Sequence, residues 1–364
     1  MIYARLLRPL LFRLEPEAAH QLTLQLLALT SATALGSSAL RRNFHYHDPA
    51  LRVSVFGIEF QNPVGLAAGY DKDGVAIAGL GMLGFGHVEI GTLTPEAQTG
   101  NPRPRIFRLV TDEAMINRLG FPNRGIDALA KQSLNQARRF YPETCIGLNL
   151  GKAKDTPNAR AVEDYIALLQ VAYPKADYIA INVSSPNTPG LRELQSEESL
   201  PQLLASISAK RAELAQQSNR LVPLLVKISP DMGTSQLEGV VQAAMEAGID
   251  GLIATNTTVR RVGLLSAQQA ETGGLSGAPL RERATEVVRQ VYRLSAGRLP
   301  IVGVGGIDNA AAALERIRAG ASLVQIYTGM VYHGPSLVQR IKRGLVAAVH
   351  AAGVASIQEL VGSD

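Results

Sequence analysis

The sequence predicts an α/β protein, a (β/α)8 (TIM) barrel preceded by a helical extension. From residue 50 onward, eight short apolar and β-branched runs alternate with segments of helical composition, which is the pattern of such a barrel. Residues 1–43 differ, because leucines recur there at helical spacing with arginines between them. A doubly wound open sheet is the alternative. It is disfavoured because no Gly-x-Gly-x-x-Gly pattern opens a helix after the first run.

The amino-terminal residues 1–43 are expected to form an amphipathic helical segment, separate from a catalytic barrel domain at residues 44–364. Leucines between residues 6 and 14 fall at helical spacing, and Pro9 is expected to kink this helix. A second helix is expected to begin at Pro16, because proline and acidic residues suit a first turn.

Four interpretations of this segment compete. A signal peptide is disfavoured because Glu15 and Glu17 stand where its apolar middle should begin. A spanning helix requires about 20 mainly apolar residues, and polar residues dilute positions 18–40. A helix pair lying on a membrane surface is favoured over a helical cap that packs on the main domain.

The eight predicted strands are each short and rich in apolar residues, and most end in a polar residue or glycine. They comprise residues 64–69, 87–92, 145–150, 178–183, 224–229, 251–256, 301–306 and 323–328. Helical segments between them include residues 161–173, 237–248 and 310–319.

Two connections are long for a barrel, at residues 93–123 and 257–277. The first contains the apolar run 105–110 and is expected to form a small hairpin. Long loops in compact domains are usually lids or binding elements. We expect both at the carboxyl-terminal face of the barrel, where barrel enzymes keep their sites.

Composition disfavours several other classes of protein. Hydrophobic residues make up 46% and charged residues 18% of the 364 positions, which indicates a folded core. The net charge of +5 comes without a Lys/Arg block interleaved with aromatic residues, so no nucleic-acid partner is expected. Cys145 is the single cysteine, and the six histidines form no ligand pair. No metal site is therefore expected.

The stretch 182–190, Asn-Val-Ser-Ser-Pro-Asn-Thr-Pro-Gly, follows the fourth predicted strand and is unusually rich in polar side chains. A long turn rich in capping residues is the alternative explanation. Similar side chains follow the other strands, so one barrel face would collect five asparagines and three lysines: Asn117, Asn149, Asn182, Asn187, Asn256, Lys72, Lys152 and Lys227.

Amides both donate and accept hydrogen bonds, which suits a flat heterocycle with N–H and C=O edges. The glycine-rich turns at 303–306 and 327–329 follow the last two strands, the usual phosphate seat of such barrels. A flavin mononucleotide (FMN) satisfies both requirements. Lys227 would stabilise negative charge on a reduced flavin ring.

At these positions the chain resembles the dihydroorotate dehydrogenase family, and within it the membrane-associated, quinone-using class. The resemblance covers essentially the whole chain. Four motifs carry it in order: Gly-Leu-Ala-Ala-Gly-Tyr-Asp-Lys at 65–72, Asn-Arg-Leu-Gly-Phe at 117–121, Asn-Val-Ser-Ser-Pro-Asn-Thr at 182–188 and Gly-Gly-Leu-Ser-Gly at 273–277.

The resemblance implies a flavin-containing barrel that oxidises (S)-dihydroorotate to orotate in de novo pyrimidine biosynthesis. Ser185 would be the catalytic base, and Thr188 is a candidate for a proton relay from it. The residues implied to hold the substrate are Lys72, Asn117, Arg118, Leu119, Gly120, Phe121, Asn182, Asn187, Asn256 and Thr257. Those implied to hold one FMN per subunit are Ala68, Gly69, Tyr70, Asp71, Lys72, Thr92, Asn149, Asn182, Lys227, Thr255, Gly277, Gly306, Tyr327 and Thr328.

The resemblance also implies partners and a location. A membrane quinone, ubiquinone or menaquinone, would reoxidise the flavin through an apolar funnel formed by the amino-terminal helices. Deletion of residues 1–40 would then abolish quinone reduction and spare flavin reduction. The protein is expected to be a monomer, peripheral on the cytoplasmic face of the bacterial inner membrane. A flavin reductase acting on another uracil-like ring and a non-catalytic membrane scaffold are the competing functions.

Overall fold

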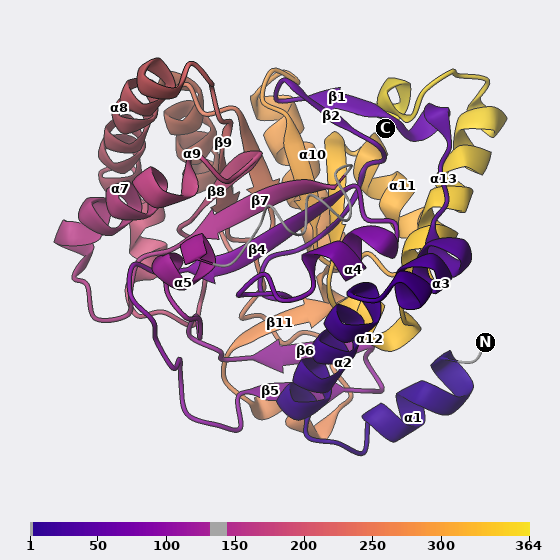
Figure 1. Ribbon diagram of the computed structural model, residues 1–364. Coiled ribbons are helices and arrows are strands. Elements are labelled where there is room, and N and C mark those ends of the chain that lie inside the picture. Colours follow the sequence, from indigo (N-terminus) through magenta and orange to yellow (C-terminus); the bar gives the residue numbers. More distant parts are fainter. Residues whose placement is uncertain (1–2, 132–143) are drawn as a thin grey trace.

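The computed structural model describes residues 3–131 and 144–364. Within these residues, eight parallel strands close a barrel, and helices pack around it (Figure 1). In barrel order the strands are β10 (Gly251–Ala254), β12 (Ile301–Val304), β13 (Ala321–Ile326), β3 (Val64–Leu66), β4 (His87–Leu93), β7 (Cys145–Leu150), β8 (Tyr178–Asn182) and β9 (Leu224–Ile228). The predicted fold class is confirmed.

Each predicted strand matches a barrel strand, although most of the observed strands end one to three residues earlier. The first strand stops at Leu66, for example, and residues 67–69 already belong to the loop. The strands are almost entirely buried, because their outer faces lie under helices and their inner faces fill the barrel. The residues beyond the ladders leave the sheet and are free to surround a site.

The helices of the barrel lie on its outer surface (Figure 1). The predicted helical segments are observed as α7 (Ala161–Ala172), α9 (Thr234–Glu246) and α11 (Ala310–Arg318). Asn309 begins α11, since its side-chain oxygen accepts a hydrogen bond from the Ala312 N–H at 2.9 Å. Among the described residues, the other α-helices that follow the first barrel strand are α4 (Ile77–Met82), α5 (Ile126–Lys131), α8 (Ser199–Ser218), α10 (Arg281–Leu294), α12 (Thr328–His333) and α13 (Leu337–Ala352).

A three-stranded antiparallel sheet stands beyond the carboxyl ends of the barrel strands, built from both long connections. The predicted hairpin is confirmed as β5 (Ile106–Leu109) and β6 (Ala114–Asn117), and β11 (Gly274–Gly277) pairs with β6. The sequence analysis did not predict that pairing, because it joins loops about 160 residues apart. A second hairpin, β1 (Val53–Val55) and β2 (Ile58–Phe60), packs at the opposite end of the barrel, where Phe60 contacts His87.

The amino-terminal segment is helical, as predicted. It consists of the π-helical turn η1 (Tyr3–Leu7), α1 (Arg8–Leu11), α2 (Pro16–Ser31) and α3 (Ala34–Phe44). The winding changes from π to α one residue before Pro9, and α2 begins at Pro16 as predicted.

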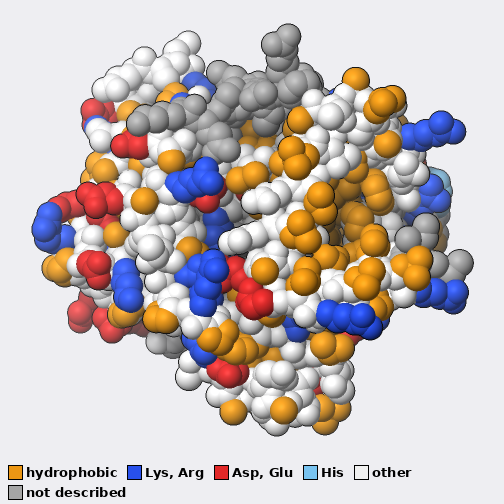
Figure 2. Space-filling model, turned by 60° about the horizontal axis from the view of Figure 1, so that its bottom comes forward, with side chains coloured by type: hydrophobic (Ala, Val, Ile, Leu, Met, Phe, Trp, Pro, Cys, Tyr) orange, Lys and Arg blue, Asp and Glu red, His pale blue; other side chains and the backbone are white. Residues whose placement is uncertain are grey.

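Helix α2 packs on the barrel domain with one face and exposes leucines on the other. Leu24 and Leu27 contact the core, whereas Leu22, Leu26 and Leu29 are 41%, 53% and 68% exposed. Figure 2 shows hydrophobic side chains gathered on the face that carries this segment. In the described residues no single helix is long and apolar enough to cross a membrane; α2 and α3 meet that test only as a pair, bent by 109°.

Candidate active site

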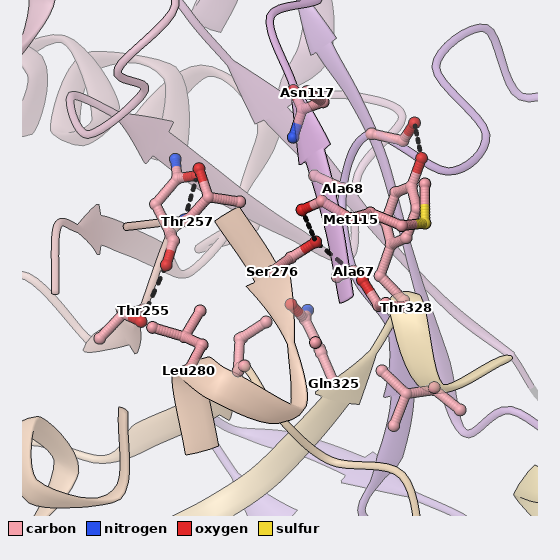
Figure 3. Close-up of a pocket in the computed structure, with 18 of the residues that line it drawn as sticks. Ala67, Ala68, Met115, Asn117, Thr255, Thr257, Ser276, Leu280, Gln325 and Thr328 are labelled. Carbon is pink, nitrogen blue, oxygen red and sulfur yellow. Dashed lines mark hydrogen bonds between the residues drawn. The ribbon is translucent and has the colours of Figure 1, made fainter. Parts of the chain in front are cut away.

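A cavity lies between the carboxyl ends of the barrel strands and the small sheet. Figure 3 shows Ala68, Thr255 and Gln325 from the barrel side facing Asn117 and Ser276 from β6 and β11. The predicted site residues that line it are Ala68, Gly69, Lys72, Thr92, Asn117, Leu119, Gly120, Phe121, Asn182, Ser185, Asn187, Lys227, Thr255, Asn256, Thr257, Gly277, Gly306, Tyr327 and Thr328. Both long connections therefore contribute to one cavity, at the face predicted for them.

The amides at the strand ends bind one another and so fix their own orientation. Asn182 at the end of β8 donates to Thr92 Oγ1 at 2.9 Å and to Asn149 Oδ1 at 3.1 Å. Across the cavity, Asn187 donates to Asn117 Oδ1 at 3.1 Å. Asn256 Nδ2 lies 3.0 Å from Ser184 Oγ. Because each amide is held by a neighbour, its free edge presents a defined donor or acceptor to the cavity.

Ser185 faces the cavity from the loop after β8 and is 5% exposed. Its Oγ accepts a hydrogen bond from the Asn187 backbone N–H at 3.2 Å. Thr188 is also buried, and its hydroxyl has no hydrogen-bond partner within the described part of the chain. Ser185 thus presents to the cavity a hydroxyl polarised by a backbone N–H, and the Thr188 hydroxyl follows three residues later in the same loop.

Lys72 follows β3 and supplies a cation to the cavity wall. Its ammonium donates to the Gly69 carbonyl at 2.6 Å. Burial lowers the pKa of Lys72 to about 8, although the nearby carboxylates of Glu17 and Asp73 oppose that shift. An anionic ligand at this wall would meet a cation that titrates close to neutral pH.

Beneath the cavity, a charged network fills the barrel interior. Glu89 on β4 has no exposed surface and lies 3.2 Å from the Lys227 ammonium. It also accepts from Asn149 at 2.8 Å, from Gln325 at 2.7 Å and from the Tyr178 hydroxyl at 3.3 Å. Because Lys227 and Gln325 both donate to Glu89, this carboxylate fixes the two side chains at the floor of the cavity.

One side of the cavity is apolar and leads toward the amino-terminal segment. Ile106, Met115 and Tyr332 line it and form a small buried cluster. Phe12, between α1 and α2, packs edge-on against Tyr332, with ring centroids 5.5 Å apart. The Arg108 guanidinium lies over the Phe12 ring, 4.6 Å from its centroid. The cavity and the helical extension therefore share one apolar wall.

Comparison with known proteins identifies the family. A family model described as dihydroorotate dehydrogenase matches residues 50–349. The chain is 52% identical over 344 residues to "Dihydroorotate dehydrogenase (quinone)" of Azotobacter vinelandii, covering 94% of this chain and 96% of that protein. It is 49% identical to the protein of the same name from Roseiflexus sp., covering 99% and 98% of the two chains.

The chain belongs to the dihydroorotate dehydrogenase family. A solved structure agrees: "DHODH in complex with ferulenol from Eimeria tenella" is 37% identical, with a TM-score of 0.86 and coverage of 96% of this chain and 95% of that one.

Four residues that the family resemblance assigned to the site do not line the cavity. Asn149 lies behind the wall, where it orients Asn182 and Thr92. Asp71 accepts from the backbone N–H groups of Val75 and Ala76 and so shapes the loop before α4. The other two are Tyr70, which packs against His20 and Tyr327, and Arg118, which pairs with Glu271.

Lys152, expected on the same face, also points elsewhere. It is 1% exposed and donates to the carbonyls of Ala153 and Thr156, the latter at 2.5 Å. Its ammonium satisfies two backbone carbonyls of the turn after β7 and so orders a loop beside the site.

Sequence reasoning missed three polar residues that organise this dihydroorotate dehydrogenase site. Glu89 and Gln325 lie inside buried barrel strands, where a polar residue in an otherwise apolar run could have identified them. Arg192 donates to the Ser184 carbonyl at 3.1 Å and to the Thr257 carbonyl at 3.0 Å. It therefore links the loop after β8 to the loop after β10, and nothing in its local sequence indicated this role.

At the cavity rim, Glu113, Asp308 and His333 bring three ligand atoms within 4.8 Å of one another, a grouping that the sequence analysis did not find. Each already has a partner. His333 Nε2 lies 3.6 Å from a Glu113 oxygen, and Asp308 accepts from Arg281 and Asn309.

Proposed function

We propose that this chain oxidises (S)-dihydroorotate to orotate and delivers the electrons to a membrane quinone, in pyrimidine biosynthesis. Membership of the dihydroorotate dehydrogenase family and the names of its relatives support this function. The main observation behind it is that Ser185, Lys72 and four asparagines line the same cavity. A ring with alternating amide edges and a carboxylate matches that set.

FMN is the proposed cofactor, one per subunit. Gly277, at the end of β11, and Gly306, two residues after β12, support it, because both line the cavity without a side chain. A ligand can therefore approach their backbone closely. Gln325 Oε1 is buried without a hydrogen-bond partner among the described residues, as expected for a group that a bound ring would satisfy. When bound, FMN would accept the hydride from C6 of dihydroorotate.

The chain's own residues would bind the substrate and move its proton. Lys72 would hold the carboxylate, and Asn117, Asn182, Asn187 and Asn256 would hold the ring. Ser185 would remove the proton at C5. A free serine hydroxyl is a weak base, so it must pass this proton onward. The Thr188 hydroxyl, which has no hydrogen-bond partner among the described residues, supports a relay through water at that point.

Electron delivery to the quinone is proposed to use the segment 1–43, attached to the catalytic barrel of residues 44–364. The apolar wall shared by the cavity and Phe12 supports entry of a long apolar molecule from that side. The exposed leucines of α2, together with exposed Arg5 and Arg13, support peripheral binding to an anionic membrane surface. We propose a monomer on the cytoplasmic face of the bacterial inner membrane, with ubiquinone or menaquinone as acceptor.

An anaerobic visible spectrum of the purified protein tests the whole proposal. The expected protein is yellow, bleaches when dihydroorotate is added, and recovers its colour with a soluble quinone analogue but not with fumarate or NAD. A yellow protein that does not bleach would overturn the substrate. A colourless protein that cannot be reconstituted with FMN would overturn the cofactor.

A further inference from the structure

Helix α2 buries a glutamate while it exposes leucines. Glu17, in its first turn, is 5% exposed, whereas Leu26 is 53% exposed. An ordinary amphipathic helix on a soluble domain keeps its charged side chains on the exposed face. An ionised carboxylate is retained in a buried place only when specific partners compensate it. Binding of the exposed leucines to a membrane surface does not explain why Glu17 is buried.

The partners of Glu17 come from the segment that leads into β5. Arg105 donates twice, from Nε to Oε2 at 3.0 Å and from Nη2 to Oε1 at 2.7 Å, and Arg103 donates to Oε1 at 3.0 Å. The Arg105 side chain is only 6% exposed. Burial alone would raise the pKa of Glu17, but the hydrogen bond and charge of Arg105 outweigh it and lower that pKa. The pair is therefore ionised and two-pronged, a geometry that fixes both partners.

Arg105 uses its remaining nitrogen to shape the loop before β5. Nη1 donates to the carbonyls of Thr99 and Asn101 at 2.6 and 2.9 Å. Asn101 then reaches two loops of the site, because its Nδ2 donates to the Arg118 carbonyl at 3.0 Å and to the Asn187 carbonyl at 3.3 Å. Its backbone N–H also donates to the Leu119 carbonyl at 2.9 Å.

This chain of contacts ends at groups already placed in the site. Asn187 supplies the N–H that polarises Ser185 and the amide that binds Asn117. Leu119 and its neighbours line the cavity. A carboxylate on the helical extension is thus joined to the substrate end of the cavity by Arg105 and Asn101, with hydrogen bonds at every step.

We propose that Glu17 is a positioning residue for dihydroorotate, holding the Asn187 and Leu119 loops through Arg105 and Asn101. The inference rests on the proposed function and extends it. The helical extension forms part of the substrate site in addition to serving the quinone. Deletion of residues 1–40 would remove the partner of Arg105 as well, so such a truncation would disturb both half-reactions rather than spare flavin reduction.

The same carboxylate also acts on Lys72 through space. The charged and titratable groups that act on Lys72 are Glu17 and His20 of α2, Arg105 before β5, and Asp71 and Asp73 of its own loop. Loss of the Glu17 charge would favour the neutral amine of Lys72. The alkaline limit of substrate binding would then move to lower pH, a change that a purely structural role would not produce.

Stopped-flow reduction of the flavin-loaded enzyme by dihydroorotate tests the proposal across pH. Glu17→Gln is expected to raise the dissociation constant for dihydroorotate by roughly two- to thirty-fold and to shift the alkaline limb downward. Glu17→Asp should recover part of the loss. Glu15→Gln is the matched control, an exposed carboxylate two positions away, and should behave as the unmodified protein. Reoxidation of dithionite-reduced enzyme by a soluble quinone should change little in any of them.

A second variant guards against misfolding. Asn101→Ala breaks the same chain of contacts without leaving a buried charge, and it should weaken dihydroorotate binding in the same direction. Unchanged binding in both Glu17→Gln and Asn101→Ala would overturn the positioning role while leaving the proposed function intact. An unmodified enzyme that dihydroorotate fails to bleach would overturn the proposed function, and the positioning role with it.

Discussion

Replacing Glu89 by glutamine should strongly destabilise the barrel, because it leaves the Lys227 ammonium buried without a counter-charge. The two charges lie 3.2 Å apart, with side chains 0% and 6% exposed. At an effective dielectric constant of about 20, this pair attracts by about 5 kcal/mol. Breaking a buried pair on one side typically costs about 3–5 kcal/mol. That is a large share of a stability of about 5–15 kcal/mol.

Hydrogen bonding works in the same direction. Glu89 accepts from Lys227, Asn149, Gln325 and Tyr178. A glutamine keeps one acceptor oxygen and adds an N–H2 group that faces other donors. We therefore expect Glu89→Gln to lose at least about 3 kcal/mol of unfolding free energy.

Urea denaturation followed by circular dichroism, with and without added FMN, measures this loss. Glu213→Gln serves as control, because it removes an exposed ion pair with Lys210 and should not change the midpoint measurably. The double variant Glu89→Gln with Lys227→Met should be more stable than Glu89→Gln alone, since it removes the unpaired ammonium. A loss below about 1 kcal/mol for Glu89→Gln, or no recovery in the double variant, would refute the reasoning.

Three further predictions concern the site and the helical extension. Ser185→Ala should slow flavin reduction by dihydroorotate about 10²- to 10⁴-fold without loss of the flavin, measured by stopped flow; an unchanged rate would exclude it as the base. Affinity for orotate should fall as pH rises above about 8, because only the protonated form of Lys72 attracts a carboxylate and burial lowers the pKa of Lys72 to about 8. In binding titrations, Lys72→Met should lose this pH dependence. A Lys72→Met curve parallel to that of the unmodified protein would argue against the assignment. Leu26→Glu should weaken binding to anionic vesicles at least tenfold in a flotation assay, since burying one leucine stabilises by about 1.5–3 kcal/mol, and equal flotation would place the membrane contact elsewhere.

The strand pattern and the strand ends could be predicted because both are local properties. The strand at residues 178–182, for example, is buried along its whole length and is apolar up to residue 181, the pattern expected of a strand buried on both faces. Parallel strands in a closed barrel present all their carboxyl ends at one face. Asn182, Ser185 and Lys227 therefore had to share a surface once the barrel was assigned, whatever the packing details.

The loop contacts could not be predicted in the same way. The pairing of β6 with β11, and the two carbonyls that Arg192 binds, depend on how loops fold back over the barrel. The same holds for Asn149, placed near the site by its position at a strand end, and for Arg118, placed there by its motif. Their side chains bind neighbouring protein groups instead.

The sequence alone was thus enough to predict the fold class and the barrel face that carries the site. Both follow from the strand pattern, since a closed parallel barrel places all its strand ends on one face. Tertiary structure alone decided that Glu17, in the helical extension, meets Arg105, 88 positions further along. No periodicity encodes such a contact. A buried ion pair forms only where two separately folded elements bring opposite charges together and exclude water around them.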